Sequence, residues 1–168
     1  MSNGQTNSTE LDPIRKDILH GDDYKKYIGY VPQNSALPAN LSIKEMAVML
    51  KELRGTENTA FEELADVLSL NRELDKKSSS LSGGTKQKAG ILLGLMFEPS
   101  LLILDEPVAF LDPSASATVK EELRSRAKEG RTILFTSHNM HEITEIADEL
   151  IYFLEGRIVY RGTPKALI

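Results

Sequence analysis

The stretch LLILDEP, residues 101–107, decides the fold class of this chain. Four apolar residues are followed directly by Asp105 and Glu106, and Pro107 then stops the run. A short apolar run that ends in carboxylates is typical of a buried parallel strand, which delivers its last side chains to the carboxyl edge of a sheet. Because a carboxylate pair in that position can also simply face water, the rest of the sequence has to decide whether it belongs to a site.

Three further runs have the character of strands. TILFTSH, residues 132–138, predicts a second buried strand that ends at His138, and YIGYVPQ, residues 27–33, predicts a strand that ends beside Gln33. ELIYFLEGRIVYRG, residues 149–162, predicts a hairpin that turns at its central Glu-Gly pair. Because most of these runs alternate with helical segments, the sequence predicts an α/β fold with a mostly parallel sheet.

Helical signals separate the strands. Two helices are predicted before the one that begins at LSGGTKQK, residues 81–88, and each starts with the capping-box pattern of a Ser or Thr followed three residues later by Glu. These pairs are Ser42 with Glu45 and Thr59 with Glu62. The predicted apolar faces consist of Ile43, Met46, Leu50 and Leu53, and of Phe61, Leu64, Ala65 and Leu68. Asp112 and Pro113 predict the start of a fourth helix, and Gly130 predicts its end.

Composition limits the classes of function. The chain has 168 residues, 40% of them hydrophobic, which suffices for one sizeable core and is short for two domains. A net charge of -5 disfavours nucleic-acid binding, and the absence of cysteine excludes disulfides and cysteine-based metal sites. The longest apolar run, at residues 89–97, is far below the roughly 18 residues that span a bilayer. The amino terminus lacks the pattern of a secretory signal.

The polar groups at the predicted strand ends are suited to phosphate chemistry. One carboxylate can hold Mg²⁺, a second can accept a proton from water, and His138 can reach a phosphate oxygen. Gln33 is a neutral group that can sense metal and water at the same edge. Ser82 with the Gly83-Gly84 pair opens a helix, where exposed amide groups and the helix dipole can bind an anion.

These cues occur in a fixed order that resembles a known family. YVPQN, LSGGTKQK, LLILDEP, FLDP and TSHNM resemble the Q-loop, signature motif, Walker B, D-loop and switch histidine of the ATP-binding subunits of ABC transporters. The resemblance runs from about residue 24 to residue 168. Two stretches, LPANLSIKEMAVMLKELRG (37–55) and GRIVYRGTPKAL (156–167), are most similar to ATPase subunits of drug- and polysaccharide-export type systems. It implies a P-loop NTPase-like sheet in which residues 24–40 and 98–168 form the catalytic core and residues 41–97 a helical insert. Residues 1–23 are predicted to be irregular.

The resemblance implies a role for each matching residue. Asp105 and Gln33 would hold Mg²⁺, Glu106 would act as general base, and His138 would contact the γ-phosphate of ATP. Gln33 would also couple the site to a transmembrane permease subunit, on which the helical insert would dock. In this family two subunits face each other, so a second ATPase subunit is the implied partner. The residues implied to contact its nucleotide or its surface are Ser82, Gly83, Gly84, Gln87 and Asp112.

One part of the family pattern is absent from this sequence. None of the eleven glycines is followed by lysine, so there is no Walker A loop, and the strand and helix that flank that loop have no counterpart. The implied domain is therefore incomplete over residues 1–168. The absent strand would lie inside the sheet, and its absence would leave exposed strand edges. Because positioning is most of phosphoryl-transfer catalysis, we expect no ATP turnover by this chain alone.

Three functions stay open at the level of sequence. The first is an ATP-binding subunit of an ABC transporter, present as a fragment, cytoplasmic and peripheral on the inner face of the cell membrane. The second is an accessory protein that supplies its signature motif in trans to a complete subunit. The third is a soluble ABC-type ATPase acting on ribosomes or chromosomes, which the lack of a coiled-coil arm or second cassette disfavours.

Overall fold

The computed structural model of the protein describes residues 23–167. The segment predicted to be irregular, residues 1–23, lies outside this range except for its last residue. There the first described element, the short 3₁₀ helix η1 (Asp23–Tyr27), begins and leads directly into the first strand.

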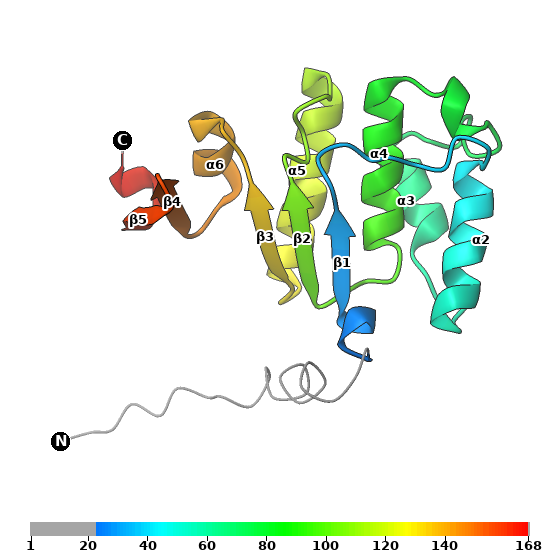
Figure 1. Cartoon of the computed structure of the whole chain (residues 1–168), viewed down its shortest axis with the longest axis horizontal. Helices are drawn as coiled ribbons and strands as arrows, with labels where there is room; N and C mark the ends of the chain where they lie inside the picture. Colours follow the sequence, from blue (N-terminus) through cyan, green and yellow to red (C-terminus); the bar gives the residue numbers. More distant parts are fainter. Residues whose placement is uncertain (1–22, 168) are drawn as a thin grey trace.

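A parallel sheet forms the centre of the molecule, as predicted (Figure 1). Its strands lie in the order β1 (Ile28–Val31), β2 (Leu101–Asp105) and β3 (Thr132–Thr136). Val31 pairs with Leu104, which pairs in turn with Phe135, so all three strands end at the same edge. The α/β class and the common strand edge are therefore confirmed.

Within residues 23–167 the chain forms five α-helices: α2 (Ile43–Arg54), α3 (Phe61–Val67), α4 (Gly83–Leu95), α5 (Pro113–Lys128) and α6 (Met140–Ile146). Figure 1 shows α5 behind β2 and β3, α4 beside β1, and α2 and α3 on the far side of α4. The 3₁₀ helix η2 (Ser78–Ser80) precedes α4. Within residues 23–167, no helix combines the length and the apolar character that crossing a membrane would require.

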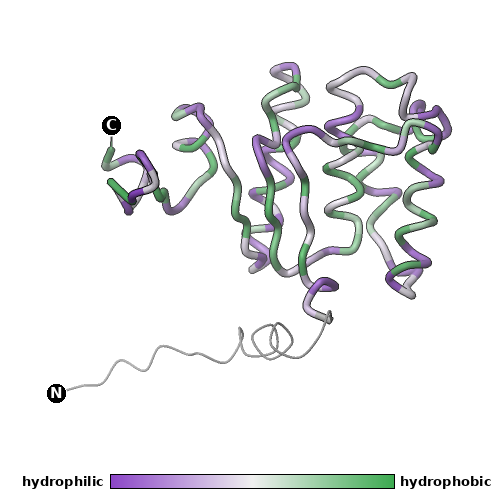
Figure 2. The backbone as a smooth tube through the Cα atoms, in the orientation of Figure 1, coloured by the Kyte–Doolittle hydropathy of each residue, from purple (hydrophilic) through white to green (hydrophobic). Residues whose placement is uncertain are grey.

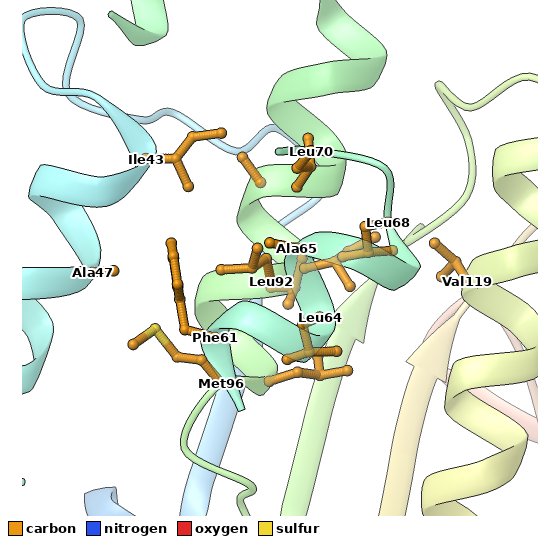
Figure 3. Close-up of a cluster of buried hydrophobic side chains, with 14 of the residues drawn as sticks. Ile43, Ala47, Phe61, Leu64, Ala65, Leu68, Leu70, Leu92, Met96 and Val119 are labelled. Atoms are coloured by element: carbon orange, nitrogen blue, oxygen red, sulfur yellow. The ribbon is translucent and has the colours of Figure 1, made fainter. Parts of the chain in front are cut away.

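The hydrophobic core lies between the sheet and these helices. Apolar residues run along β2 and β3 and along much of α4 (Figure 2). The side chains of α2, α3 and α4 meet in one cluster, which Val119 of α5 joins from the other side (Figure 3). Fully buried members include Ile43, Leu64, Leu92, Met96 and Val119. This cluster fixes the helical insert to the strands that carry the site.

The structure confirms one of the two predicted capping boxes. Ser42 accepts a hydrogen bond from the amide of Glu45, and the Glu45 carboxylate accepts one from the Ser42 amide, so the first capping box is confirmed. The second is wrong, because α3 begins after Ala60 with no side-chain cap. The Thr59 hydroxyl is buried and has no hydrogen-bond partner among residues 23–167. The prediction that Leu53 belongs to the buried apolar face of its helix is also wrong. Leu53 lies in the last turn of α2 and is 75% exposed.

No element within residues 23–167 covers one face of the sheet, and β3 is exposed there, which corrects the prediction that β3 is buried. The register places Tyr30, Ile103 and Leu134 side by side in one row across the three strands. Tyr30 is 59% and Leu134 is 57% exposed, whereas Leu102 and Leu104, which alternate with Ile103 along β2, are buried against the helices. Among the described residues, helices cover only that second face, and an apolar row therefore remains open on the first (Figure 1).

The predicted hairpin is confirmed as a separate two-stranded sheet. β4 (Leu150–Leu154) and β5 (Arg157–Gly162) pair antiparallel. Glu155 and Gly156 both adopt positive φ, 49° and 76°, as a tight two-residue hairpin turn requires. No described strand joins this hairpin to β3. The last element, η3 (Pro164–Ala166), is a 3₁₀ helix that follows Thr163.

Candidate functional site

Asp105 and Glu106 lie where β2 ends, and Thr136 at the end of β3 holds both. The Thr136 hydroxyl donates to the Asp105 carboxylate at 2.5 Å and accepts from the Glu106 amide at 3.1 Å. Thr136 also pairs with Asp105 in the strand register. One oxygen of Asp105 is therefore fixed by the neighbouring strand, and the other remains available for a ligand.

Glu106 turns away from the strand direction and meets His138. Its backbone has a φ of 48°, a left-handed conformation that is uncommon outside glycine and is often found at functional sites. The turn carries Glu106 Oε1 to 2.7 Å from His138 Nδ1. The Glu106 side chain is 14% exposed, and that of His138 is 81% exposed. The hydrogen bond from Glu106, together with its negative charge, raises the pKa of His138 above its ordinary value.

Gln33 lies at the same edge without touching these groups. It is exposed in the bend that follows β1, two residues beyond Val31. Within residues 23–167, its side chain forms no hydrogen bond with Asp105, Glu106 or His138. The structure thus brings two of the predicted catalytic residues into contact and leaves Gln33 on a loop beside them.

The Gly83-Gly84 pair at the start of α4 serves two different purposes. Ser82 is the N-cap, and its hydroxyl lies 3.2 Å from the Thr85 amide and 2.8 Å from the Thr85 hydroxyl. A Cβ on Gly84 would lie 3.2 Å from the carbonyl oxygen of Phe110, whereas one on Gly83 would meet no atom of the described residues within 4 Å. Gly84 therefore allows close packing within the chain, and Gly83 with Ser82 faces open space.

Gln87 and Asp112 are both tied into the fold. Gln87 is 2% exposed, and its amide bonds Ser35 on one side and the Pro107 carbonyl on the other. The predicted contact of Gln87 with nucleotide stays a prediction, and in this chain its side chain bonds Ser35 and Pro107. Asp112 caps α5 by accepting from the amides of Ser114 and Ala115, each at 3.0 Å, and these bonds lower its pKa. Asp112 is nevertheless exposed, so its outer surface is available to a partner.

The donor set suits Mg²⁺ bound to phosphate better than a metal ion held by protein alone. Within residues 23–167, no group of three or more His, Cys, Asp or Glu side chains is arranged to hold a metal ion. Mg²⁺ typically keeps several waters and takes one or two carboxylates plus phosphate oxygens, which Asp105 with its free oxygen satisfies. For the phosphates, the sequence supplies Ser82 and the open amide end of α4, but no lysine after a glycine.

Sequence reasoning missed Thr136. It was read only as part of the strand TILFT, although a hydroxyl at the end of a strand next to a carboxylate pair is well placed to orient that pair. Aligning the ends of the two predicted strands would have placed Thr136 opposite Asp105, which is the register observed.

Comparisons with known proteins identify relatives of the chain. The profile of the ABC transporter family matches residues 3–109, and so reaches further toward the amino terminus than the motifs do. Carnitine transport ATP-binding protein OpuCA of Listeria monocytogenes is 36% identical over 161 residues, which are 91% of this chain and 41% of the relative. Nod factor export ATP-binding protein I of Burkholderia orbicola is 34% identical over 86% of this chain and 49% of its own.

An import protein and a solved structure extend the comparison. Molybdate/tungstate import ATP-binding protein WtpC of Archaeoglobus fulgidus is 36% identical over 85% of this chain and 61% of its own length. A solved structure titled as the ATP-binding subunit of an ABC transporter superposes with a TM-score of 0.77 at 27% identity. That superposition covers 84% of this chain and 60% of the solved one. The chain thus spans between 41% and 61% of the length of these relatives.

Proposed function

Because this chain belongs to the ABC transporter family, we propose that it acts as part of an ATP-binding subunit of a membrane transporter, at the cytoplasmic face of the membrane. The observation that carries the proposal is the contact of Glu106 with His138, 2.7 Å apart, beside Asp105 at the common strand edge. The family implies nucleotide binding, and this cluster is where the chain offers groups suited to a phosphate and its metal ion.

Each group has a role that follows from its surroundings. Asp105, held on one oxygen by Thr136, would bind Mg²⁺, which neutralises phosphate charge when present. Glu106 would orient and deprotonate the attacking water, and His138 would contact the γ-phosphate. Glu106 and His138 are now hydrogen-bonded to each other. This bond has to open before Glu106 can bind the water and His138 the phosphate. Gln33, on its exposed loop, would reach the metal ion or the water after the loop moves.

The start of α4 is proposed to face a nucleotide held by a second ATPase subunit. Ser82 and Gly83 are exposed at the amide end of a 13-residue helix, and no atom of residues 23–167 lies within 4 Å of a Cβ built on Gly83. Amide groups and the helix dipole favour an anion at this point. Asp112, on the adjacent loop, would lie in the contact between the two subunits.

A groove beside the site is proposed to receive the transmembrane permease. It has a volume of about 500 Å³ and lies between β1, the loop after β1, α2 and α4. Its wall is mostly apolar and includes Leu37, Leu50, Leu93 and Phe97. The loop that carries Gln33 forms one side, because Pro32, Ser35 and Ala36 line the same groove. A permease segment seated here would therefore press on the loop next to the catalytic edge.

Complementation of an ATP-binding subunit with an inactivated signature motif tests the proposal. A complete ABC ATP-binding subunit, whose own signature serine is replaced by arginine, is mixed with increasing amounts of this chain, and phosphate release is measured. Ser82 of this chain is then the one signature serine that can act on the partner's nucleotide. We expect phosphate release to rise with added chain, and Ser82→Arg to abolish the rise. Ser79→Arg, at an exposed serine three residues earlier, is the matched control and should leave the rise intact.

The same experiment separates two readings of the chain. Stimulation that depends on Ser82 but not on Glu106 supports an accessory protein that lends its signature motif, a role for which the exposed Ser82–Gly83 loop is suited. Phosphate release by the chain alone, above that of a Glu106→Gln variant, would show that it holds nucleotide without the Walker A loop. No stimulation at any ratio would count against both readings.

A further inference from the structure

Gln87 is an unusual residue for its place. It lies in the second turn of α4, within the helix that Ser82 caps, and is one of the few buried polar side chains among the described residues. A buried primary amide has several hydrogen-bonding positions to satisfy, and leaving them unpaired costs free energy. A glutamine is therefore a costly choice here unless its two ends each have a partner.

Both partners of Gln87 belong to loops that the proposed function uses. The Gln87 Nε2 group donates to the carbonyl oxygen of Pro107 at 3.3 Å, and its Oε1 accepts from the Ser35 hydroxyl at 3.4 Å. Pro107 directly follows Glu106, and Ser35 lies two residues after Gln33 in the wall of the groove. These two bonds span 20 and 52 residues of sequence, so α4 joins segments that are otherwise far apart.

The backbone of α4 is built to approach these loops closely. A Cβ on Gly84 would lie 3.2 Å from the Phe110 carbonyl oxygen, and one on Gly90 would lie 2.1 Å from the Ser35 hydroxyl. Glycine at these points lets one side of the helix rest against the segment after Glu106 and the other against the loop after β1. Gln87 lies between the two glycines in sequence and bonds both segments.

The segment after Glu106 is held by packing as well as by hydrogen bonds: Pro107 and Val108 are buried, and Val108 belongs to the hydrophobic core. Glu106 has a φ of 48°, and the turn closes through the Ala109 amide to the Glu106 carbonyl at 3.2 Å. The next bond, from the Leu111 amide to the Val108 carbonyl, is also 3.2 Å long. The bond from Gln87 to the Pro107 carbonyl adds a link between this turn and α4.

We propose that Gln87 is a positioning residue, which fixes the turn that carries Glu106 and ties that turn to Ser35 in the groove wall. The proposal rests on the proposed function only in taking Glu106 as the general base and the groove as the docking site. It predicts that a change at Ser35 is felt at the Glu106 turn through Gln87. The positioning itself can be measured without nucleotide.

Amide hydrogen exchange in the full chain, followed by NMR, tests the positioning. Gln87→Leu keeps the volume of the side chain and removes both bonds. Because one hydrogen bond contributes about 1 kcal/mol net, we expect exchange of the Ala109 and Leu111 amides to rise about fivefold relative to the Leu123 amide in α5. Ile91→Val, a buried change one turn along the same helix, is the matched control and should leave this ratio unchanged.

Two further measurements keep the test decisive. In Gln87→Leu, the His138 ring signals at fixed pH should move toward their positions in Glu106→Gln, because a displaced Glu106 releases the histidine. Ser35→Ala removes only the 3.4 Å bond to Gln87 and should raise the Ala109 exchange ratio about twofold. This variant provides the test if Gln87→Leu does not fold.

An unchanged Ala109 ratio in a folded variant, or equal acceleration of all core amides, would overturn the proposal. Because no measurement here involves ATP, its failure leaves the ATPase complementation result untouched, and the reverse also holds.

Discussion

Arg54 is predicted to hold the helical insert against the start of the sheet, and its loss should measurably destabilise the chain. The residue ends α2 and reaches back to the segment before β1. Its guanidinium donates to the carbonyl oxygens of Ile28 at 3.0 Å, Lys26 at 3.1 Å and Lys25 at 3.4 Å. It also lies over the ring of Phe97, 4.5 Å from the centroid. Arg54→Ala removes all four interactions at once.

The size of the effect follows from how exposed each interaction is. The bond to Ile28 is partly buried and involves a charged donor, so it contributes about 1.5 kcal/mol. The bonds to Lys25 and Lys26 are exposed and together add at most about 0.5 kcal/mol. The contact with Phe97 adds about 0.5–1 kcal/mol. The free energy of unfolding should therefore fall by about 2–3 kcal/mol, a large part of the stability of a small domain.

Urea unfolding followed by circular dichroism measures this change. With a slope of about 2 kcal/mol per M, a loss of that size lowers the midpoint by about 1–1.5 M. Arg54→Lys keeps the charge but not the planar fork, and should fall between the wild type and Arg54→Ala. Leu53→Ala, at the neighbouring exposed position, is the matched control and should change the midpoint by less than about 0.25 M. A midpoint for Arg54→Ala equal to that of Leu53→Ala would refute the reasoning.

Three further outcomes follow from the described contacts. Glu106→Gln should lower the pKa of His138, measured by NMR titration, toward its ordinary value of 6.5. In the wild type, the stabilisation of the fold by this pair is fully present below pH 6.5 and is lost as the pH rises through the raised pKa of His138. Ser42→Ala removes a confirmed capping box and should lower the free energy of unfolding by about 1 kcal/mol in urea titrations. Ser79→Ala, at a serine that caps no helix, should leave the free energy of unfolding unchanged. Leu134→Lys should reduce binding of the dye ANS without loss of stability, because the open sheet face binds the dye; unchanged fluorescence would show that this face is covered.

Local chemistry made much of the fold predictable. The strand ends, the caps at Ser42 and Asp112, and the hairpin turn at Glu155 are each specified by a few adjacent residues, and the structure confirms them. Such features depend on backbone conformations and short-range hydrogen bonds, which the order of residues encodes directly. The second capping box failed because Thr59 lies one residue too early, and helix boundaries are the least certain part of any pattern.

The errors concern residues whose surroundings are distant in sequence. TILFT has the composition of a strand buried on both faces, yet what covers a face is decided by other segments, and within residues 23–167 none covers Leu134. The partners of the buried Gln87 side chain, Ser35 and Pro107, could not be predicted either, because no local pattern connects them to it. Thr136 was missed for the same reason, since its role exists only in the register with β2.

The two halves of the proposed nucleotide machinery differ in what they require from elsewhere. Glu106 and His138 are now bonded to each other, and they act only on a phosphate that other groups hold in place. For Ser82 and Gly83, the cap on α4 is already formed, and among the described residues the space beside Gly83 is open. A partner subunit that holds its own nucleotide could therefore contact Ser82 and Gly83 without further rearrangement of α4. The Glu106 edge, in contrast, depends on a phosphate-binding loop that these 168 residues do not supply.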